Sequence, residues 1–229
     1  MRKSTERGHA NHGWLDTYHT FSFANYYDPE HMGFRSLRVI NEDRIAAGQG
    51  FGTHPHKDME ILTWVLEGAI AHKDSTGGGS VLRPNMIQHM TAGSGITHSE
   101  FNPSDSELTH LLQIWISPEK NGLTLSYSER RFDPDQWRGR FKVMASPSGR
   151  DGSVEIKQDV ELLVAELGAG EHAAHTLNEG RYAWVQVTRG SVTVNGVALA
   201  AGDGAAFDRE RELSFSASET SQTLIFDVN

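Results

Sequence analysis

The sequence predicts an all-β protein, and three observations lead to that prediction. Short apolar runs rich in β-branched and aromatic residues recur along the 229 residues, separated by glycine, proline, asparagine or aspartate. No long stretch keeps the apolar period of a helix. One part of the second half also resembles part of the first. Many short strands with turn signals between them are typical of β-sandwiches and β-barrels.

The expected strands are runs that favour a pleated, half-buried surface and have turn residues on both sides. In chain order they cover residues 36–40, 60–66, 69–74, 86–93, 109–117, 160–167, 181–190, 191–199, 212–218 and 222–228. Asn195 and Gly196 are a two-residue signal for a type I′ hairpin inside one of these segments. A turn of helix is expected only within 117–132.

An internal similarity suggests two copies of one β unit. The run "AGQGFGTHPHKDMEILTWVLEGAIAHKDSTG" resembles "LGAGEHAAHTLNEGRYAWVQVTRGSVTVNG" in its order of glycine turn, histidine pair, aromatic strand, glycine and second strand. Trp64 matches Trp184, and Gly68 matches Gly190. We therefore expect two domains, with residues 133–153 as the joint between them.

Composition narrows the function classes. The formal net charge is −9 and the acidic residues are spread along the chain, which argues against direct nucleic-acid binding. The absence of cysteine excludes disulfides, thiolate zinc sites and cysteine nucleophiles. No apolar run has the length of a membrane span, and the N-terminal residues lack the apolar core of a secretory signal. We expect a cytoplasmic protein with no membrane partner.

Two histidine-containing pairs carry the clearest chemical signal. His54 and His56 are two residues apart, as are His98 and Glu100, and side chains at i and i+2 of a strand point to the same face. Pro55 favours an extended backbone at His54. If the two strands face each other, three imidazoles and one carboxylate converge. Such nitrogen and oxygen ligands suit a divalent first-row metal, and open coordination positions distinguish a catalytic site from a structural one.

These motifs resemble those of a known family. "GTHPHKDMEILTWVLEG" followed by "MTAGSGITHSE" resembles the two ligand motifs of the pirin family, a branch of the cupins. "RGHANHGWLDTYHTFSFANYYDPEHMGFRSLRVINED" and "LLQIWISPEKNG" are similar to bacterial pirin-like proteins, so the resemblance covers nearly the whole chain. It implies a bicupin fold of two jelly-roll-like barrels. Residues 1–132 would be the metal-binding barrel, and residues 154–229 a degenerate barrel without metal.

The resemblance also implies a ligand set. Carried over by position, the metal ligands are His54, His56, His98 and Glu100. Cupins in general take a carboxylate from their first motif, where Glu60 stands, whereas pirin-type proteins use the glutamate of His-x-Glu, which is Glu100 here. We therefore expect Glu60 to orient a metal-bound imidazole. Because a carboxylate ligand has a second oxygen, Glu100 is also the expected catalytic base, with Glu60 as its competitor.

Two functions from different classes follow from the resemblance. Bacterial members are associated with quercetin 2,3-dioxygenase activity, which implies a metal-dependent enzyme that cleaves a flavonol such as quercetin with O2 and releases CO. We expect this enzyme to be a monomer. Iron is the first expectation for the metal, and Mn, Ni, Co, Cu and Zn remain open. The alternative is a metal-binding regulatory protein that acts through a protein partner. A deep apolar pocket ending at the metal would favour the enzyme, and a large exposed apolar patch would favour the regulator.

The remaining histidines have a simpler interpretation. The N-terminal set could form a second metal site, but hydrogen-bonded packing is the expected role, and the single histidines of later strands are also expected to pack. His172 and His175 are three residues apart and should point to opposite faces of a strand. We therefore expect no metal in the second half. The histidines given packing roles are His9, His12, His19, His31, His72, His89 and His110.

Overall fold

A computed structural model describes all residues, 1–229, and its regular structure is almost entirely β-strand. The helices are short 3₁₀ turns: η1 (Ser4–Glu6), η2 (Pro134–Gln136) and η3 (Arg150–Gly152). None of them has the length or apolar character needed to span a membrane. The all-β class expected from the sequence is confirmed.

The chain divides into two compact units whose boundaries differ from the expected domains. The N-terminal unit comprises Gly8–Phe132 together with Ile156–Gln158. The C-terminal unit comprises Met1–Arg7, Asp133–Glu155 and Asp159–Asn229. Residues 133–153, expected to be the joint between the domains, belong to the C-terminal unit. They contain strand β12 (Lys142–Ser146), which pairs within that unit.

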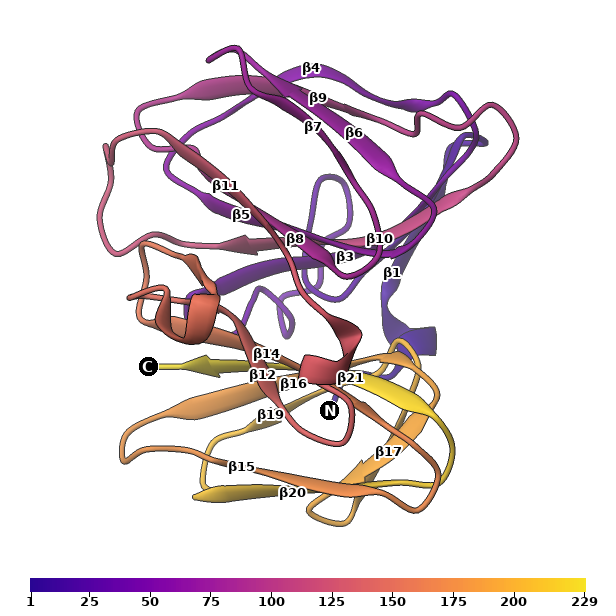
Figure 1. Cartoon of the computed structure of the whole chain (residues 1–229), viewed down its shortest axis with the longest axis vertical. Coiled ribbons are helices and arrows are strands. Elements are labelled where there is room, and N and C mark those ends of the chain that lie inside the picture. The colour runs from indigo at the N-terminus through magenta and orange to yellow at the C-terminus, as the bar shows by residue number, and fades with distance from the viewer. The chain divides into compact units, whose positions relative to one another are not determined.

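The N-terminal unit consists of two antiparallel sheets (Figure 1). Apolar side chains pack between the sheets. The larger sheet has the order β1 (Gly8–Asn11), β2 (Leu15–His19), β3 (Leu37–Ile45), β10 (Thr109–Ile116), β5 (Glu60–Glu67), β8 (Met86–Thr91) and β11 (Ser126–Arg131). The smaller sheet has the order β4 (Gly50–His56), β9 (Ile96–Phe101), β6 (Ile70–Asp74) and β7 (Gly79–Leu82). Ile45 and Val65 of the larger sheet share one core cluster with Ile70 and Leu82 of the smaller sheet.

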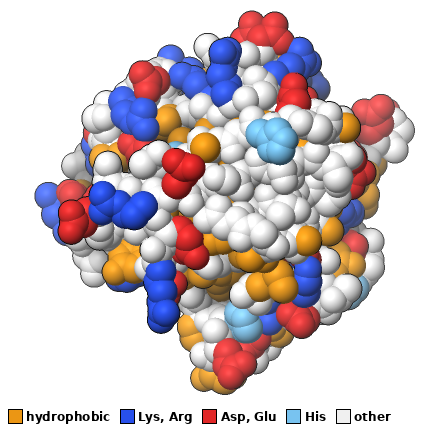
Figure 2. Space-filling view, turned by 90° about the horizontal axis from the view of Figure 1, so that it is seen from below, with side chains coloured by type: hydrophobic (Ala, Val, Ile, Leu, Met, Phe, Trp, Pro, Cys, Tyr) orange, Lys and Arg blue, Asp and Glu red, His pale blue; other side chains and the backbone are white.

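The C-terminal unit repeats this two-sheet plan. Its larger sheet has the order β13 (Val154–Glu155), β12, β14 (Val160–Leu167), β21 (Ser221–Val228), β16 (Tyr182–Arg189) and β19 (Gly204–Phe207). Its smaller sheet has the order β15 (His172–Thr176), β20 (Glu212–Ala217), β17 (Ser191–Val194) and β18 (Val197–Ala200). Val185 and Ile225 from the first sheet pack with Val192 and Phe215 from the second. Acidic and basic side chains are interspersed around the face of the molecule drawn in Figure 2.

The internal similarity corresponds to a repeated structural unit. β4, β5 and β6 follow one another as β15, β16 and β17 do, and Trp64 and Trp184 are both buried. Gly68 and Gly190 have φ of 74° and 66°, in the left-handed region that favours glycine. A β-carbon on Gly68 would lie 2.6 Å from the carbonyl oxygen of Leu108, and one on Gly190 would meet the corresponding oxygen of Thr220.

The hairpin signal is confirmed, but the expected helical turn is not. Asn195 and Gly196 both have positive φ, 47° and 83°, and they join β17 to β18. Within 117–132, however, Ser126–Arg131 form strand β11, which pairs antiparallel with β8. The backbone groups of β8 need partners on that side, and a neighbouring strand supplies them. This long-range requirement overrides the weak helical period.

Candidate metal centre

The two histidine motifs lie on paired strands. β4 pairs antiparallel with β9, with His54 opposite His98 and Pro55 opposite Thr97. β4 is the edge strand of its sheet, and an edge strand tolerates a proline because one side of its backbone needs no partner in the sheet. At the other end of β4, a β-carbon on Gly50 would clash with the carbonyl oxygen of Glu100, so a glycine there allows the close approach of β9.

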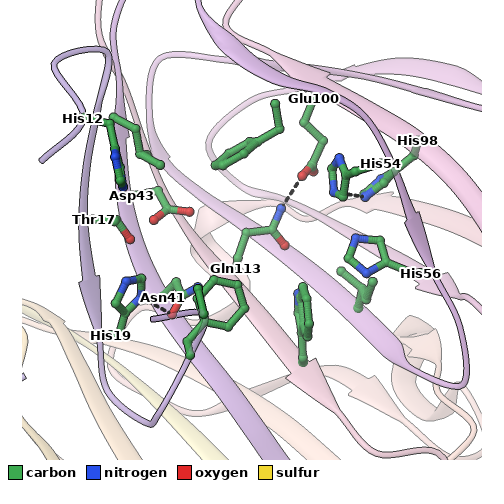
Figure 3. Close-up of a pocket in the computed structure, with 16 residues that line it drawn as sticks. His12, Thr17, His19, Asn41, Asp43, His54, His56, His98, Glu100 and Gln113 are labelled. Carbon is green, nitrogen blue, oxygen red and sulfur yellow. Dashed lines mark hydrogen bonds between the residues drawn. The ribbon is translucent and has the colours of Figure 1, made fainter. Parts of the chain in front are cut away.

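The pairing brings the three histidines together. One ring nitrogen from each of His54, His56 and His98 lies within 4.8 Å of the others. The Nε2 atoms of His54 and His98 are 3.0 Å apart, and the three rings point toward one another (Figure 3). Burial lowers the pKa of His56 to about 4 and, together with the neighbouring imidazoles, the pKa of His98 to about 3. Both rings are therefore neutral at pH 7, the state in which imidazole binds a metal.

Hydrogen bonds at the remote nitrogens orient two of these rings. His54 Nδ1 lies 2.8 Å from the carbonyl oxygen of Gly52, which requires it to donate. His98 Nδ1 lies 3.0 Å from Nε2 of His72, and His72 stacks on Tyr127 with ring centroids 5.0 Å apart. Both contacts leave Nε2 free to ligate, as partners of metal-bound imidazoles do. The donor set therefore fits a divalent transition metal, which His54, His56 and His98 would hold.

Glu100 lines the same pocket, but its carboxylate is turned toward the larger sheet. Gln113 Nε2 donates to Glu100 Oε2 over 2.6 Å, and Thr63 Oγ1 lies 3.5 Å from Oε1. Burial, with a contribution from the charge of Asp43, raises the pKa of Glu100 to about 7. Glu100 is not part of the group of ring nitrogens within 4.8 Å of one another. Its role as fourth ligand stays a prediction.

The orienting role expected for Glu60 is wrong. Successive residues of β5 point to opposite faces, and Ile61 lines the pocket, so Glu60 points away from it. Glu60 is fully buried, and its Oε2 lies 2.7 Å from His89 Nε2 and accepts a hydrogen bond from the backbone of Lys157 over 3.0 Å. His72 and the Gly52 carbonyl occupy the orienting positions instead. Sequence reasoning assigned His72 only a packing role, because its contact depends on the pairing of β6 with β9.

A cavity of about 280 Å³ opens beside the histidines. Its walls come from β2, β3, β4, β5, β9 and β10, together with loop residues. The lining residues are His12, Leu15, Thr17, His19, Phe23, Ala24, Asn41, Asp43, Phe51, His54, His56, Ile61, His98, Glu100, Gln113 and Trp115. Apolar and aromatic walls with a few polar groups are typical of a small-molecule site. The pocket lies wholly within the N-terminal unit.

Several of the other histidines lie in hydrogen-bonded contacts, whereas His12 is exposed and lines the cavity. His9 lies 2.6 Å from Asp16, His31 lies 2.9 Å from Asp28, and His19 lies 2.8 Å from Asn41. In the C-terminal unit His172 is exposed on β15. His175 Nε2 lies 2.8 Å from Asp227, which also accepts from Arg181. The two side chains point to opposite faces, as their spacing predicts.

Two family models match the chain. The pirin model matches residues 1–116, and the model described as the quercetinase C-terminal cupin domain matches residues 143–228. The first contains the histidine motifs, and the second contains most of the C-terminal unit. The bicupin fold expected from the resemblance is confirmed.

Individual relatives agree with the family models. A quercetin 2,3-dioxygenase of Escherichia coli is 54% identical over 228 residues, which cover 100% of this chain and 97% of the relative. A pirin-like protein of Caulobacter vibrioides is 41% identical, with 96% and 95% covered. The crystal structure of the bacterial pirin YhhW from E. coli in complex with nickel(II) superposes with a TM-score of 0.94 at 53% identity, covering 99% of this chain and 97% of that chain. The chain belongs to the pirin family.

Proposed function

We propose that this protein is a metal-dependent quercetin 2,3-dioxygenase, which cleaves a flavonol with O2 and releases CO. The observation that carries the proposal is the apolar pocket that ends at His54, His56 and His98. Identity of 54% to a protein named quercetin 2,3-dioxygenase, over the whole chain, supports the choice of substrate.

The pocket favours an enzyme over a regulatory protein that acts only through a partner. Phe51 and Trp115 line it next to the histidines, and the ring of Trp115 contacts His56 edge-on at 4.8 Å between centroids. These flat walls suit a planar aromatic substrate and exclude water from its ring. An apolar pocket that ends at the metal site distinguishes an enzyme from such a regulator, and the cavity beside the histidines has this form.

The reaction needs a deprotonated flavonol next to O2. A transition-metal ion held by the histidines supplies polarisation of the substrate oxygen and redox chemistry toward O2. Both atoms of O2 enter the product, the heterocyclic ring opens, and one ring carbon leaves as CO. The remainder is a depside, an ester of two aromatic acids.

Glu100 is the base that we assign to the hydroxyl proton. The imidazoles commit their lone pairs to the ion, whereas a carboxylate has two oxygens. Gln113 holds Oε2 of Glu100 through a 2.6 Å hydrogen bond, and this contact fixes the orientation of the carboxylate beside the histidines. A base held in position within a dry pocket is effective because it does not have to reorganise during proton transfer.

The test combines metal analysis with product analysis. Protein purified without added metal is assayed for its metal content, and then each candidate metal, Fe, Mn, Ni, Co, Cu and Zn, is loaded separately. We expect CO and depside in equal amounts from quercetin, and neither from His98→Ala at the same total metal concentration. Loaded wild-type protein that releases no CO above the free metal ion would overturn the proposal. We also propose a monomer in the cytoplasm, and light scattering of the purified protein tests the monomeric state.

A further inference from the structure

A buried carboxyl group lies at the end of the pocket opposite the histidines. Asp43 is on β3, is only 3% exposed, and lines the cavity. Figure 3 shows it next to Thr17, with Asn41 nearby, across the pocket from His54, His56 and His98. The mechanism proposed above gives this carboxyl group no role.

One oxygen of this carboxyl group lacks a partner. Thr17 hydrogen-bonds to the Asp43 side chain, but Oδ1 has no hydrogen-bond partner, although it is fully buried. The nearest basic residue along the strand, Arg44, points to the other face of β3, where it binds Glu42. Burial raises the pKa of Asp43 to about 7. Leaving a buried polar atom unpaired is costly, so such atoms in native proteins need an explanation.

The walls between the two ends of the pocket define which part of a ligand can reach the carboxyl group of Asp43. Phe23, Phe51, Ile61 and Trp115 line the cavity together with the polar groups at each end. A planar molecule bound at the histidines through one oxygen therefore lies along apolar surface and presents its far edge to β2 and β3. A hydroxyl on that edge can both donate and accept, so it can pair with Asp43 in either protonation state.

We propose that Asp43 selects the substrate by pairing its carboxyl group, which lines the cavity and is incompletely hydrogen-bonded, with a hydroxyl group on the part of the flavonol that lies farthest from the histidines. This inference rests on the proposed flavonol oxygenase activity and adds which flavonols the pocket prefers. A site built to pair a hydroxyl rejects an analogue that lacks it, because the buried protein group is then left without a partner. A hydrogen bond to a charged or buried carboxyl group corresponds to about 10- to 100-fold in affinity.

The test compares quercetin with 3-hydroxyflavone, which keeps the 3-hydroxyl and lacks all the others. Dissociation constants are measured on metal-loaded protein without O2, by quenching of tryptophan fluorescence, so that binding is read without turnover. Wild type should bind quercetin about 10- to 100-fold more tightly than 3-hydroxyflavone. Asp43→Leu should lose that preference by weakening quercetin binding. With O2 present, KM for quercetin should rise while kcat changes less.

The neighbouring carboxylate provides a matched control. Glu42 precedes Asp43 on β3 but faces the other side of the sheet, where it contacts Arg44 and His110. Glu42→Gln should keep the wild-type preference and the wild-type metal content. Asp43→Asn keeps the shape of the side chain and serves if Asp43→Leu does not fold. It should lower the preference to a smaller extent, because the amide retains an acceptor oxygen without the charge.

The result that overturns the proposal is an unchanged preference in a folded, metal-loaded Asp43 variant. Wild-type protein that binds the two flavonols equally would overturn it as well. Both results leave the proposed function standing as long as CO is released. Conversely, tight and selective binding without CO release would refute the dioxygenase proposal and retain the role of Asp43.

Discussion

Individual side chains divide the pocket into two chemically different ends. At one end, His54, His56 and His98 place one ring nitrogen each within 4.8 Å of the others. The carboxyl groups of Glu100 and Asp43 line the same cavity, and burial raises the pKa of each to about 7. The charge of Asp43 contributes to the raised pKa of Glu100, and the charge of Glu42 contributes to the raised pKa of Asp43. A substrate hydroxyl can pair with a buried carboxyl group, and a metal cation favours its ionised form.

The role of Glu100 is tested by Glu100→Gln, which keeps the shape and a carbonyl oxygen but removes the basic oxygen. We expect weaker metal binding and, at full loading, a loss of about 100-fold or more in turnover. Glu60→Gln is the control, since Glu60 contacts His89 outside the pocket and its loss should be smaller. Turnover per bound metal is the quantity to compare. If metal-loaded Glu100→Gln turned over at the wild-type rate while Glu60→Gln lost activity, the catalytic base would be Glu60 and not Glu100.

The pH dependence of the metal dissociation constant tests whether Glu100 is a ligand. A proton on a ligand opposes the metal, so affinity falls as the pH drops through the pKa that the ligand has in the metal-free protein. Glu100, with a pKa of about 7, contributes over the range from pH 7 to pH 4, whereas His56 and His98 contribute only near pH 4 and 3. Nickel dissociation constants should therefore show a pH slope smaller by about one proton in Glu100→Gln than in wild type. Equal slopes would remove Glu100 from the ligand set.

Strand pairing explains how these residues meet. His54 and His98 face each other because β4 and β9 are antiparallel neighbours, and His72 reaches His98 because β6 pairs with β9 on its other side. A shift of one residue in either pairing would turn a whole set of side chains to the other face. Glycines allow close approaches of the backbone at the turns, since a β-carbon on Gly68 or Gly190 would strike a carbonyl oxygen.

A pair of glycine variants separates this steric effect from backbone strain. Gly180 has φ of 78° with nothing within 4 Å of a β-carbon, whereas Gly190 has φ of 66° and would meet Thr220. Gly180→Ala should cost about 1 kcal/mol of the free energy of unfolding from strain alone. Gly190→Ala should cost roughly 2 to 4 kcal/mol, because overpacking adds to the strain. Urea unfolding measures both, and equal losses would show that the contact at Gly190 is relieved by relaxation.

At the scale of the whole molecule, two similar units differ in their chemistry. The N-terminal unit brings three imidazoles together, whereas at the related position of the C-terminal unit His175 is engaged by Asp227 and His172 is exposed. Asp227 is also held by Arg181, so this cluster is a salt-bridged part of the β15 and β21 packing. The side chains of this cluster hydrogen-bond to one another, so they offer no set of free lone pairs to a metal ion.

Metal content follows from this difference. We expect one metal ion per chain by elemental analysis, lost in His98→Ala and retained in the double variant His172→Ala and His175→Ala. Turnover of the double variant should stay near wild type, because these side chains lie outside the pocket of the N-terminal unit. Two ions per chain, or a large loss of activity in a stable double variant, would contradict the assignment of the metal and the chemistry to the N-terminal unit alone.

The sequence by itself determined the class of fold and most of its strands. Alternating apolar runs and turn residues are local signals, so β5, β14, β16 and β21 lie close to their expected ranges, and Asn195-Gly196 forms the expected hairpin. The i, i+2 spacing of His54 with His56 is also local, because a strand of any register puts both on one face. Family resemblance then supplied the ligand set and the bicupin plan.

Only the tertiary structure decided which distant residues meet. β11 replaced the expected turn of helix because β8 needed a partner strand. Glu60 lies outside the site because it precedes Ile61 in β5 and therefore points to the opposite face of the strand. His72 contacts His98 because β6 pairs with β9, a strand about 25 residues later in the chain. Asp43 reaches the pocket in the same way, through the order of β2, β3 and β10 in the sheet. Such contacts depend on register and sheet order, which are set by the burial of the whole core and leave no local mark on the sequence.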